Sequence, residues 1–198
     1  MSLHGFSQLA TPYLEQKLTI AELFSKKVYF FTVNYEIGDV TYVIDRSLTP
    51  DHSDLLHVEQ NGDSSIQRYS SLSTEEITVL GVVVAIVFLQ SGLSVPENND
   101  IDAWLMPERS TSFIARSAVN YPKRNIKIGD LLIVERDHEY GDDDLLVLME
   151  EGRFVCREIR ISTCELVDAD NNVTKITKKL TVEGAVVANI RVIRKCKA

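Results

Sequence analysis

The chain has 198 residues, of which 44% are hydrophobic and 25% charged, and it carries a net charge of −8 at pH 7. Such a composition is ordinary for a globular protein, and the length allows one large domain or two small ones. The acidic excess repels phosphate backbones, so it argues against non-specific nucleic-acid binding, and we expect no direct sequence-specific binding either.

The cysteines and the apolar runs indicate the cellular compartment of the protein. Cys156, Cys164 and Cys196 are odd in number and form no CxxC pair, which argues against a disulfide framework and indicates a reducing, cytoplasmic compartment. The longest apolar run, Ile77–Leu89, has 13 residues, whereas a membrane-spanning helix needs about 20. We therefore expect a buried strand there, no signal peptide at the start of the chain and no membrane contact.

In chain order, short runs rich in Val, Ile, Leu, Phe and Tyr alternate with turns, which predicts a mainly β protein. Leu18–Phe24 and Asp102–Leu105 each allow a helix or a turn. The expected strands are Lys27–Val33, Val40–Asp45, Ser53–Val58, Thr78–Val87, Ser112–Val119, Leu131–Arg136, Asp144–Met149, Arg153–Ile161, Thr174–Val182 and Ala185–Ile193.

The sequence also contains an internal repeat. "TVLGVVVAIV" (Thr78–Val87) and "TVEGAVVANI" (Thr181–Ile190) are identical at six of ten positions. Earlier matches follow in the same order, which predicts two copies of one fold. These matches are Ser53–Gly62 with Asp143–Gly152, Gly38-Asp39 and Val43 with Gly129-Asp130 and Val134, and Val33–Tyr35 with Val119–Tyr121.

These matches divide the chain into three parts. We expect a first copy over residues 4–89, a linker over residues 90–100 that is rich in Gly, Ser, Pro and Asn, and a second copy over residues 101–198. The second copy is longer in two places. One of these insertions contains "DADNN" (Asp168–Asn172), which predicts a hairpin turn.

The same residues resemble the C-terminal peptidase domain shared by LexA-type repressors and UmuD. "GDLLIV" (Gly129–Val134), "GRFVCREI" (Gly152–Ile159) and "GAVVANI" (Gly184–Ile190) follow the order of that family's strands. "HGFSQLATPYLEQKLTIAELF" (His4–Phe24) resembles the stretch that begins at the self-cleavage site of UmuD. The resemblance implies two tandem LexA/UmuD-like domains of the β-clip type, related by a pseudo-two-fold axis, that begin as if already processed.

In that family a serine is the nucleophile, and an unprotonated lysine in an apolar site is its general base. The serine position here is Asn120 and the lysine position is Arg157; in the first copy they are Asn34 and Gln67. An asparagine amide is a poor nucleophile, arginine stays protonated and glutamine does not titrate. The resemblance therefore implies an inactive pseudo-peptidase. Ser117, the alternative nucleophile, pairs with no lysine at the family's spacing.

Other candidate sites are weaker. Asp168–Lys179 starts like a calcium loop but has Val173 and Lys179 where glycine and glutamate belong. The acidic turn Glu139–Asp144 is expected to be solvated, and the four histidines lack metal-ligand spacing, so we predict neither metal nor cofactor. The basic loop beside the inactive site is either solvated or a contact for a partner or DNA; its residues are Lys123, Arg124 and Lys127.

The processed UmuD family acts as a homodimer that binds a Y-family DNA polymerase in the SOS response to DNA damage. The resemblance implies a single-chain version of that dimer, with a UmuC-like polymerase as partner and RecA and UmuD as further candidates. One alternative is a decoy that binds UmuD or LexA-type proteins; another is a residual self-cleaving serine peptidase. We expect a monomer whose copies meet along the two valine-rich strands, with Val83, Ala85, Val87, Val187, Asn189 and Arg191 as interface candidates.

Overall fold

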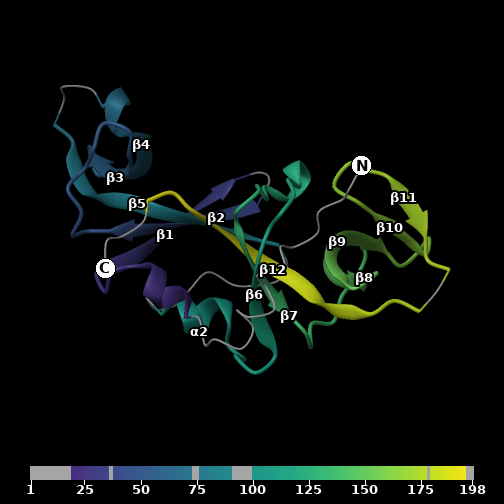
Figure 1. Ribbon diagram of the computed structural model, residues 1–198. Coiled ribbons are helices and arrows are strands. Elements are labelled where there is room, and N and C mark those ends of the chain that lie inside the picture. The colour runs from purple at the N-terminus through teal and green to yellow at the C-terminus, as the bar shows by residue number, and fades with distance from the viewer. Residues whose placement is uncertain (1–18, 36–37, 73–75, 91–99, 178, 195–198) are drawn as a thin grey trace.

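The computed structural model describes residues 19–35, 38–72, 76–90, 100–177 and 179–194. Within these residues the protein is mainly β, as the sequence predicts, and its strands join in one curled antiparallel sheet (Figure 1). The strands are β1 (Val28–Tyr35), β2 (Gly38–Asp45), β3 (Leu55–Gln60), β4 (Asp63–Arg68), β5 (Thr78–Leu89), β6 (Ser112–Arg116), β7 (Leu131–Glu135), β8 (Leu145–Glu150), β9 (Arg153–Arg160), β10 (Glu165–Val167), β11 (Val173–Lys175) and β12 (Val182–Val192). The helices are α2 (Ile101–Leu105) and the 3-10 turns η1 (Ile20–Leu23), η2 (Tyr69–Ser71) and η3 (Pro122–Arg124).

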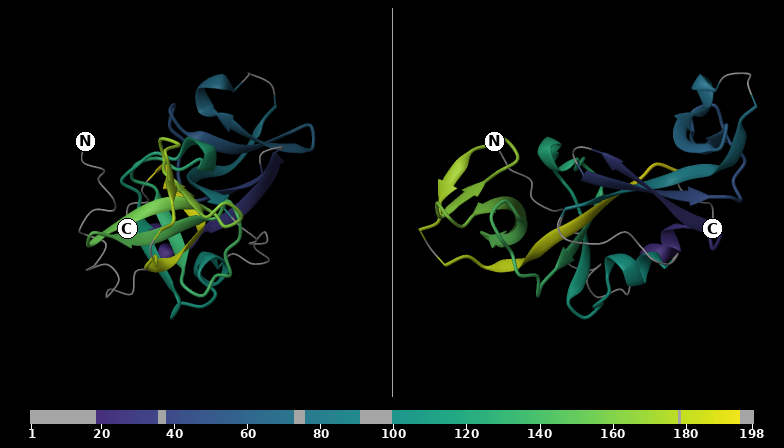
Figure 2. Two further views of the ribbon diagram at one scale, coloured as in Figure 1. Left: turned by 90° about the vertical axis from the view of Figure 1, so that its right-hand side faces the viewer. Right: turned by 180° about the vertical axis from the view of Figure 1, so that it is seen from behind.

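Two long strands, β5 and β12, form the spine of the sheet. β5 pairs with β2 along one edge; along the other edge it pairs first with β3 and then with β12. β12 repeats this arrangement, with β7 on one edge and β8 followed by β5 on the other. The hairpins β3–β4 and β8–β9 therefore lie at opposite ends of an elongated molecule (Figures 1 and 2).

The pairing pattern of the first five strands recurs in the later strands, including the positions of the register shifts. In β5 the ladder shifts register between Val79 and Gly81 and again between Val83 and Ala85. In β12 it shifts at the corresponding places, which are Val182 to Gly184 and Val186 to Ala188. A β-bulge bends its strand and increases its twist, so two bulges at matching places give both spine strands the same curvature.

A glycine follows the first bulge of each spine strand because a neighbouring backbone passes close by. A Cβ on Gly184 would lie 2.6 Å from the carbonyl oxygen of Glu135, and the φ of Gly184 is +156°. A Cβ on Gly81 would lie 2.6 Å from Cγ2 of Ile44 and 3.1 Å from the carbonyl oxygen of Asp45. A side chain at Gly184 would require the backbone at Glu135 to shift, and a side chain at Gly81 would require the side chain of Ile44 to move, so glycine suits both places.

The strand registers correct two of the sequence matches. Ile44 pairs with Val83 as Val134 pairs with Val186, so equivalent positions on the flanking strands lie 90 residues apart (134 − 44). Val43 therefore corresponds to Ile133 and not to Val134. On the first strand of each copy, Val33 faces Val40 and corresponds to Ser117, which hydrogen bonds to Asp130. The match of Val33–Tyr35 with Val119–Tyr121 was thus displaced by two residues.

The element predictions were right for most strands and wrong at a few places. β4 and β10 were not predicted, because β4 has a single apolar residue and β10 is only three residues long. It extended the sixth strand to Val119, whereas β6 ends at Arg116 and a loop follows. It also predicted one strand over Thr174–Val182, whereas β11 ends at Lys175. The turn at Asp168–Asn172 is confirmed, since it joins β10 to β11 as a hairpin.

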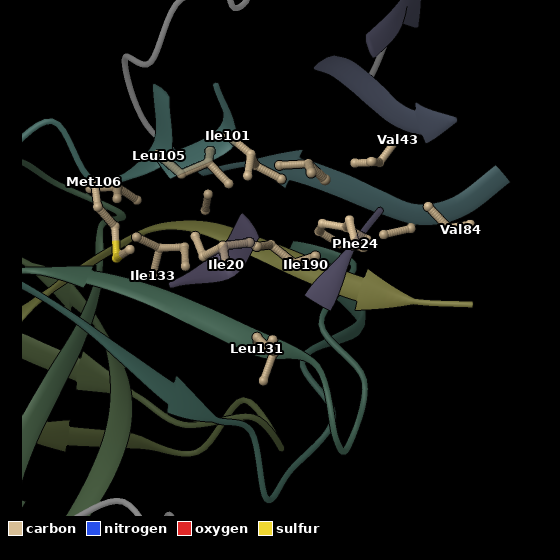
Figure 3. Packing of buried hydrophobic residues seen from close by; sticks show 14 residues of the cluster. Ile20, Phe24, Val43, Val84, Ile101, Leu105, Met106, Leu131, Ile133 and Ile190 are labelled. Carbon is tan, nitrogen blue, oxygen red and sulfur yellow. The ribbon is translucent and has the colours of Figure 1, made fainter. Parts of the chain in front are cut away.

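The largest hydrophobic core is shared by both halves of the chain (Figure 3). The turn η1 and the helix α2 lie together over the spine strands, and the backbone N–H of Ile20 donates to a carboxylate oxygen of Asp102 at 2.7 Å. The ring of Trp104 packs against this core and lies 5.4 Å from the ring of Phe30. The buried members are Ile20, Phe24, Val43, Val84, Ala85, Val87, Ile101, Leu105, Met106, Leu131, Ile133, Val187, Ala188 and Ile190.

Candidate functional site

The loop after β6 and the middle of β9 line an open cavity of about 270 Å³. Asn120 lines it from the loop and Arg157 lines it from β9, so the structure brings together the two positions that the sequence analysis singled out in the second copy. Asp168 and Ala169 of the β10–β11 hairpin close a further side. The cavity therefore lies between three segments that are distant in the sequence.

Hydrogen bonds within the loop hold Asn120 in place. Ser117 is buried, and its hydroxyl donates to the carbonyl of Val119 at 2.7 Å, so it is engaged in shaping the turn. The side-chain oxygen of Asn120 accepts from the backbone N–H of Ile128 at 3.0 Å. Asn125 has a φ of +55°, a left-handed conformation that asparagine tolerates better than most residues. Asn120 thus closes the loop, a structural task that needs an amide or carboxylate oxygen.

Tyr121 anchors the same loop to β9. Its hydroxyl donates to the backbone carbonyl of Cys156 at 2.5 Å, and its ring is buried. Burial raises the pKa of the Tyr121 hydroxyl well above its usual range, so the hydroxyl stays protonated and donates at neutral pH. Burial also raises the pKa of the Cys156 thiol to about 12. A protonated, enclosed thiol is a poor nucleophile, so Cys156 belongs to the core of the site.

Arg157 is held by an ion pair. Its Nη2 lies 3.0 Å from a carboxylate oxygen of Glu150, and its Nη1 donates to the carbonyl of Cys156 at 3.0 Å. A guanidinium remains charged at every physiological pH, so Arg157 cannot accept a proton from a nucleophile. The described lining of the cavity therefore combines the guanidinium of Arg157 with the carboxylates of Asp168 and Asp170, and it holds no serine–lysine pair.

The three basic residues of the loop have different surroundings. Lys123 and Lys127 are exposed. Arg124 is half-buried; its Nη2 donates to Glu158 at 3.1 Å and also to the carbonyl of Asp143, so it ties the loop to the β8–β9 region. A free basic patch at this loop is thus limited to two lysines.

Hydrogen bonds within the hairpin turn that borders the cavity hold the turn in shape. The carboxylate of Asp168 accepts from the backbone N–H groups of Asp170 and Asn172 at 2.9 and 2.8 Å. Partial burial would raise the pKa of Asp168, but the hydrogen bonds from Asn172 and Asp170 outweigh it and lower the pKa. Among the described residues, no group of three or more His, Cys, Asp or Glu side chains is arranged to hold a metal ion.

The first copy has no equivalent loop. Asn34 lies inside β1, is exposed and pairs with Asp39. Gln67 lies in β4 opposite Leu56, which is the same register as Arg157 opposite Leu146. Gln67 therefore does correspond to Arg157. Asn120, in contrast, lies in a loop whose counterpart in the first copy is the two-residue connection between β1 and β2.

The interface candidates lie in or next to the pairing of β5 with β12. Val87 faces Ile190, Ala85 faces Val192, Asn189 faces Phe88 and Arg191 faces Ile86. Val83 pairs instead with Ile44 of β2, and Val187 is the bulged residue of β12, whose carbonyl accepts from the N–H of Gln90 at 2.9 Å.

Sequence reasoning missed a buried polar network beside that pairing. Arg191 donates to both carboxylate oxygens of Asp130, at 3.1 and 2.8 Å, and Asn189 donates to Asp130 at 3.3 Å. Gln90 donates to the side chain of Asn189 at 2.6 Å and to the carbonyl of Arg124 at 2.9 Å. Asp130 was visible in the sequence within the Gly-Asp turn, but its partner Arg191 comes from a distant strand.

Comparison with known proteins gives no further guide to the chain. No family model matches it, and no curated protein matches it. In the part of the chain that the structure describes, no helix is long and apolar enough to cross a membrane.

Proposed function

We propose that the chain is a single-chain counterpart of the processed UmuD dimer, made of two tandem LexA/UmuD-like domains, and that it acts as an inactive accessory subunit of a Y-family translesion polymerase. The observation that carries the proposal is the pairing of β5 with β12. Val87 and Ile190 occupy the same position of the repeated motif and face each other. The flanking pairs, Ala85 with Val192 and Leu89 with Ala188, exchange under a two-fold rotation about that point.

The shared core supports the same proposal. Residues from both halves of the chain pack into it, and the two short helices meet above the spine strands. Joining two protomers in one chain makes their association intramolecular, with an effective concentration in the millimolar range for a short linker. A fused dimer would therefore remain assembled at any protein concentration in the cell.

The inactive cavity is compatible with this role. An accessory subunit that resembles the processed form has no further bond to cut, so a serine and a lysine are dispensable. Asn120 and Arg157 instead close a loop and bind Glu150. The residual-peptidase alternative would need a nucleophile and a base from elsewhere, because the hydroxyl of Ser117 donates a hydrogen bond to the carbonyl of Val119 inside the turn.

The decoy alternative depends on exchanging one copy for a protomer of UmuD or a LexA-type protein. Both edges of β5 and both edges of β12 are occupied within the chain. An exchange would have to break the β5–β12 ladder and open the shared core. The pairing therefore favours the fused accessory subunit over the decoy.

The test is a calorimetric titration of the chain against the Y-family polymerase of the same organism, in the absence of UmuD. We expect binding at micromolar concentration or tighter, with one chain per polymerase. Binding of UmuD or a LexA-type protein without binding of the polymerase would favour the decoy and overturn the proposal.

A further inference from the structure

One face of the first copy is apolar and only half-buried. It comprises side chains from β1, β4 and β5 that point to the side of the sheet opposite the shared core, and we call it the open face. These residues pack on Val40, Tyr42, Ile44 and Val83, yet each remains partly accessible to solvent. The open face consists of Tyr29, Phe31, Val33, Ile66, Ile86 and Phe88.

The equivalent face of the second copy is covered. The strand registers place Phe113, Ala115 and Ser117 where the first copy has Tyr29, Phe31 and Val33, and all three are buried. Cys156 and Asn189, which correspond to Ile66 and Ile86, are buried as well. The same framework thus buries these positions in one copy and leaves them half-buried in the other.

The loop between β6 and β7 makes the difference. It lays Tyr121 and Ile126 on the second copy's face, where both are almost fully buried. In the first copy, β1 ends at Tyr35 and β2 begins at Gly38, so two residues connect them. Such a short connection cannot fold back over the sheet. Among the described residues, the open face therefore has no counterpart of the loop that covers this place in the second copy.

The aromatic side chains of the open face are held in fixed positions. The ring of Phe31 stacks on the ring of His57 with centroids 4.1 Å apart, and the hydroxyl of Tyr29 lies 2.6 Å from Nδ1 of His57. The guanidinium of Arg46 lies 4.2 Å above the ring of Tyr29. A partner that binds rings already held in place loses little side-chain entropy, which favours binding. Apolar surfaces of this kind, rimmed by polar residues, mark interaction sites.

We propose that the open face docks the polymerase of the proposed function, on which this inference rests, through a segment that presents apolar side chains. The net charge of the chain favours the polymerase as the partner that binds the open face. The chain carries a net charge of −8, whereas a polymerase that holds DNA presents basic surface, so the two attract at long range. A second copy of the chain carries the same charge and is repelled. Nucleic acid is disfavoured by the same acidic charge and by the apolar character of the face.

The experiment compares two matched double variants in the titration against the polymerase. The test variant is Val33→Ser with Ile66→Ser, on the open face; Ser117 shows that the fold accepts serine at the position of Val33. The control is Val173→Ser with Ile161→Ser, which are exposed residues near the β10–β11 hairpin. We expect the test variant to raise the Kd at least tenfold and the control to leave it unchanged, with both variants folded by circular dichroism.

Hydrogen exchange of the wild-type chain keeps the inference testable if the double variant fails to fold. On addition of polymerase, we expect slower exchange over residues 28–35 and 63–68 and no change over 112–116. If the wild type binds with those segments unprotected, or the folded test variant binds as well as the wild type, the inference is wrong and the proposed function stands. If the wild type does not bind, both are wrong. A dimer of the chain that the test variant abolishes would assign the face to a second copy and overturn the inference.

Discussion

His57 and Val147 occupy equivalent positions in the two copies, and the difference between them gives the first copy a titratable core residue. His57 is buried, and its Nε2 has no hydrogen-bond partner among the described atoms. Burial lowers the pKa of His57, and the nearby Arg46 lowers it further, against a smaller opposing effect of Glu59. The folded protein therefore favours the neutral ring.

This pKa shift predicts a pH-dependent stability. Because the unfolded chain binds a proton at His57 more readily than the folded chain does, the free energy of unfolding is highest above pH 6.5, the ordinary pKa of histidine, and falls as the pH is lowered. We expect urea denaturation to show a smaller loss of stability between pH 7.5 and pH 5 in His57→Val than in the wild type. His52→Asn, at an exposed position, is the control; an equal slope in His57→Val and the wild type would contradict this assignment.

The residues that line the cavity between β6 and β9 predict an intact chain. Asn120 cannot attack a peptide bond and Arg157 cannot serve as a base, so the mass of 22.3 kDa should persist during incubation at alkaline pH or with RecA filaments. Mass spectrometry over several hours measures this directly, with an active LexA-type protein in the same tube as positive control. A specific fragment pair from this chain would revive the peptidase alternative.

At the scale of elements, the bulged spine strands determine the shape of the sheet. Gly184→Ala would place a Cβ 2.6 Å from the carbonyl oxygen of Glu135. We expect it to lower the free energy of unfolding by about 3 kcal/mol, the combined effect of overpacking and an unfavourable φ. Gly141→Ala, where a Cβ meets no atom within 4 Å, should change it by less than about 0.5 kcal/mol. Thermal or urea denaturation compares the two; equal stabilities would mean that the close approach is absent in solution.

The sequence was most informative where an element has a strong apolar pattern. The spine strands and the repeat were readable because Val, Ile and Gly recur in one order, and the Gly-Asp turn and the hairpin at Asp168 were readable from turn residues. β4 was not predicted because it is almost entirely polar, and β10 was not predicted because it has only three residues. The pairing of Asp130 with Arg191 and the contact of Tyr121 with Cys156 could not be predicted, since each joins segments at least 35 residues apart.

At the scale of the whole molecule, the largest core contains residues from both halves of the chain, and this predicts a single unfolding transition. Ile190 is fully buried beneath the pairing of the spine strands, so Ile190→Ala should lower the free energy of unfolding by about 3 kcal/mol. Ile193→Ala, two-fifths exposed at 41%, should have little effect. Within each variant, the fluorescence of Trp104 and the circular dichroism should give the same midpoint, and this midpoint should be lower for Ile190→Ala than for Ile193→Ala. Separate midpoints for the two probes would indicate copies that unfold independently.

The most direct test of the proposed single-chain dimer is the mass of the protein in solution. Sedimentation equilibrium at micromolar concentration should give 22.3 kDa, the mass of one chain, because both edges of each spine strand are already paired within the chain. An obligate dimer of twice that mass, in which β5 of one chain pairs with β12 of another, would contradict the account.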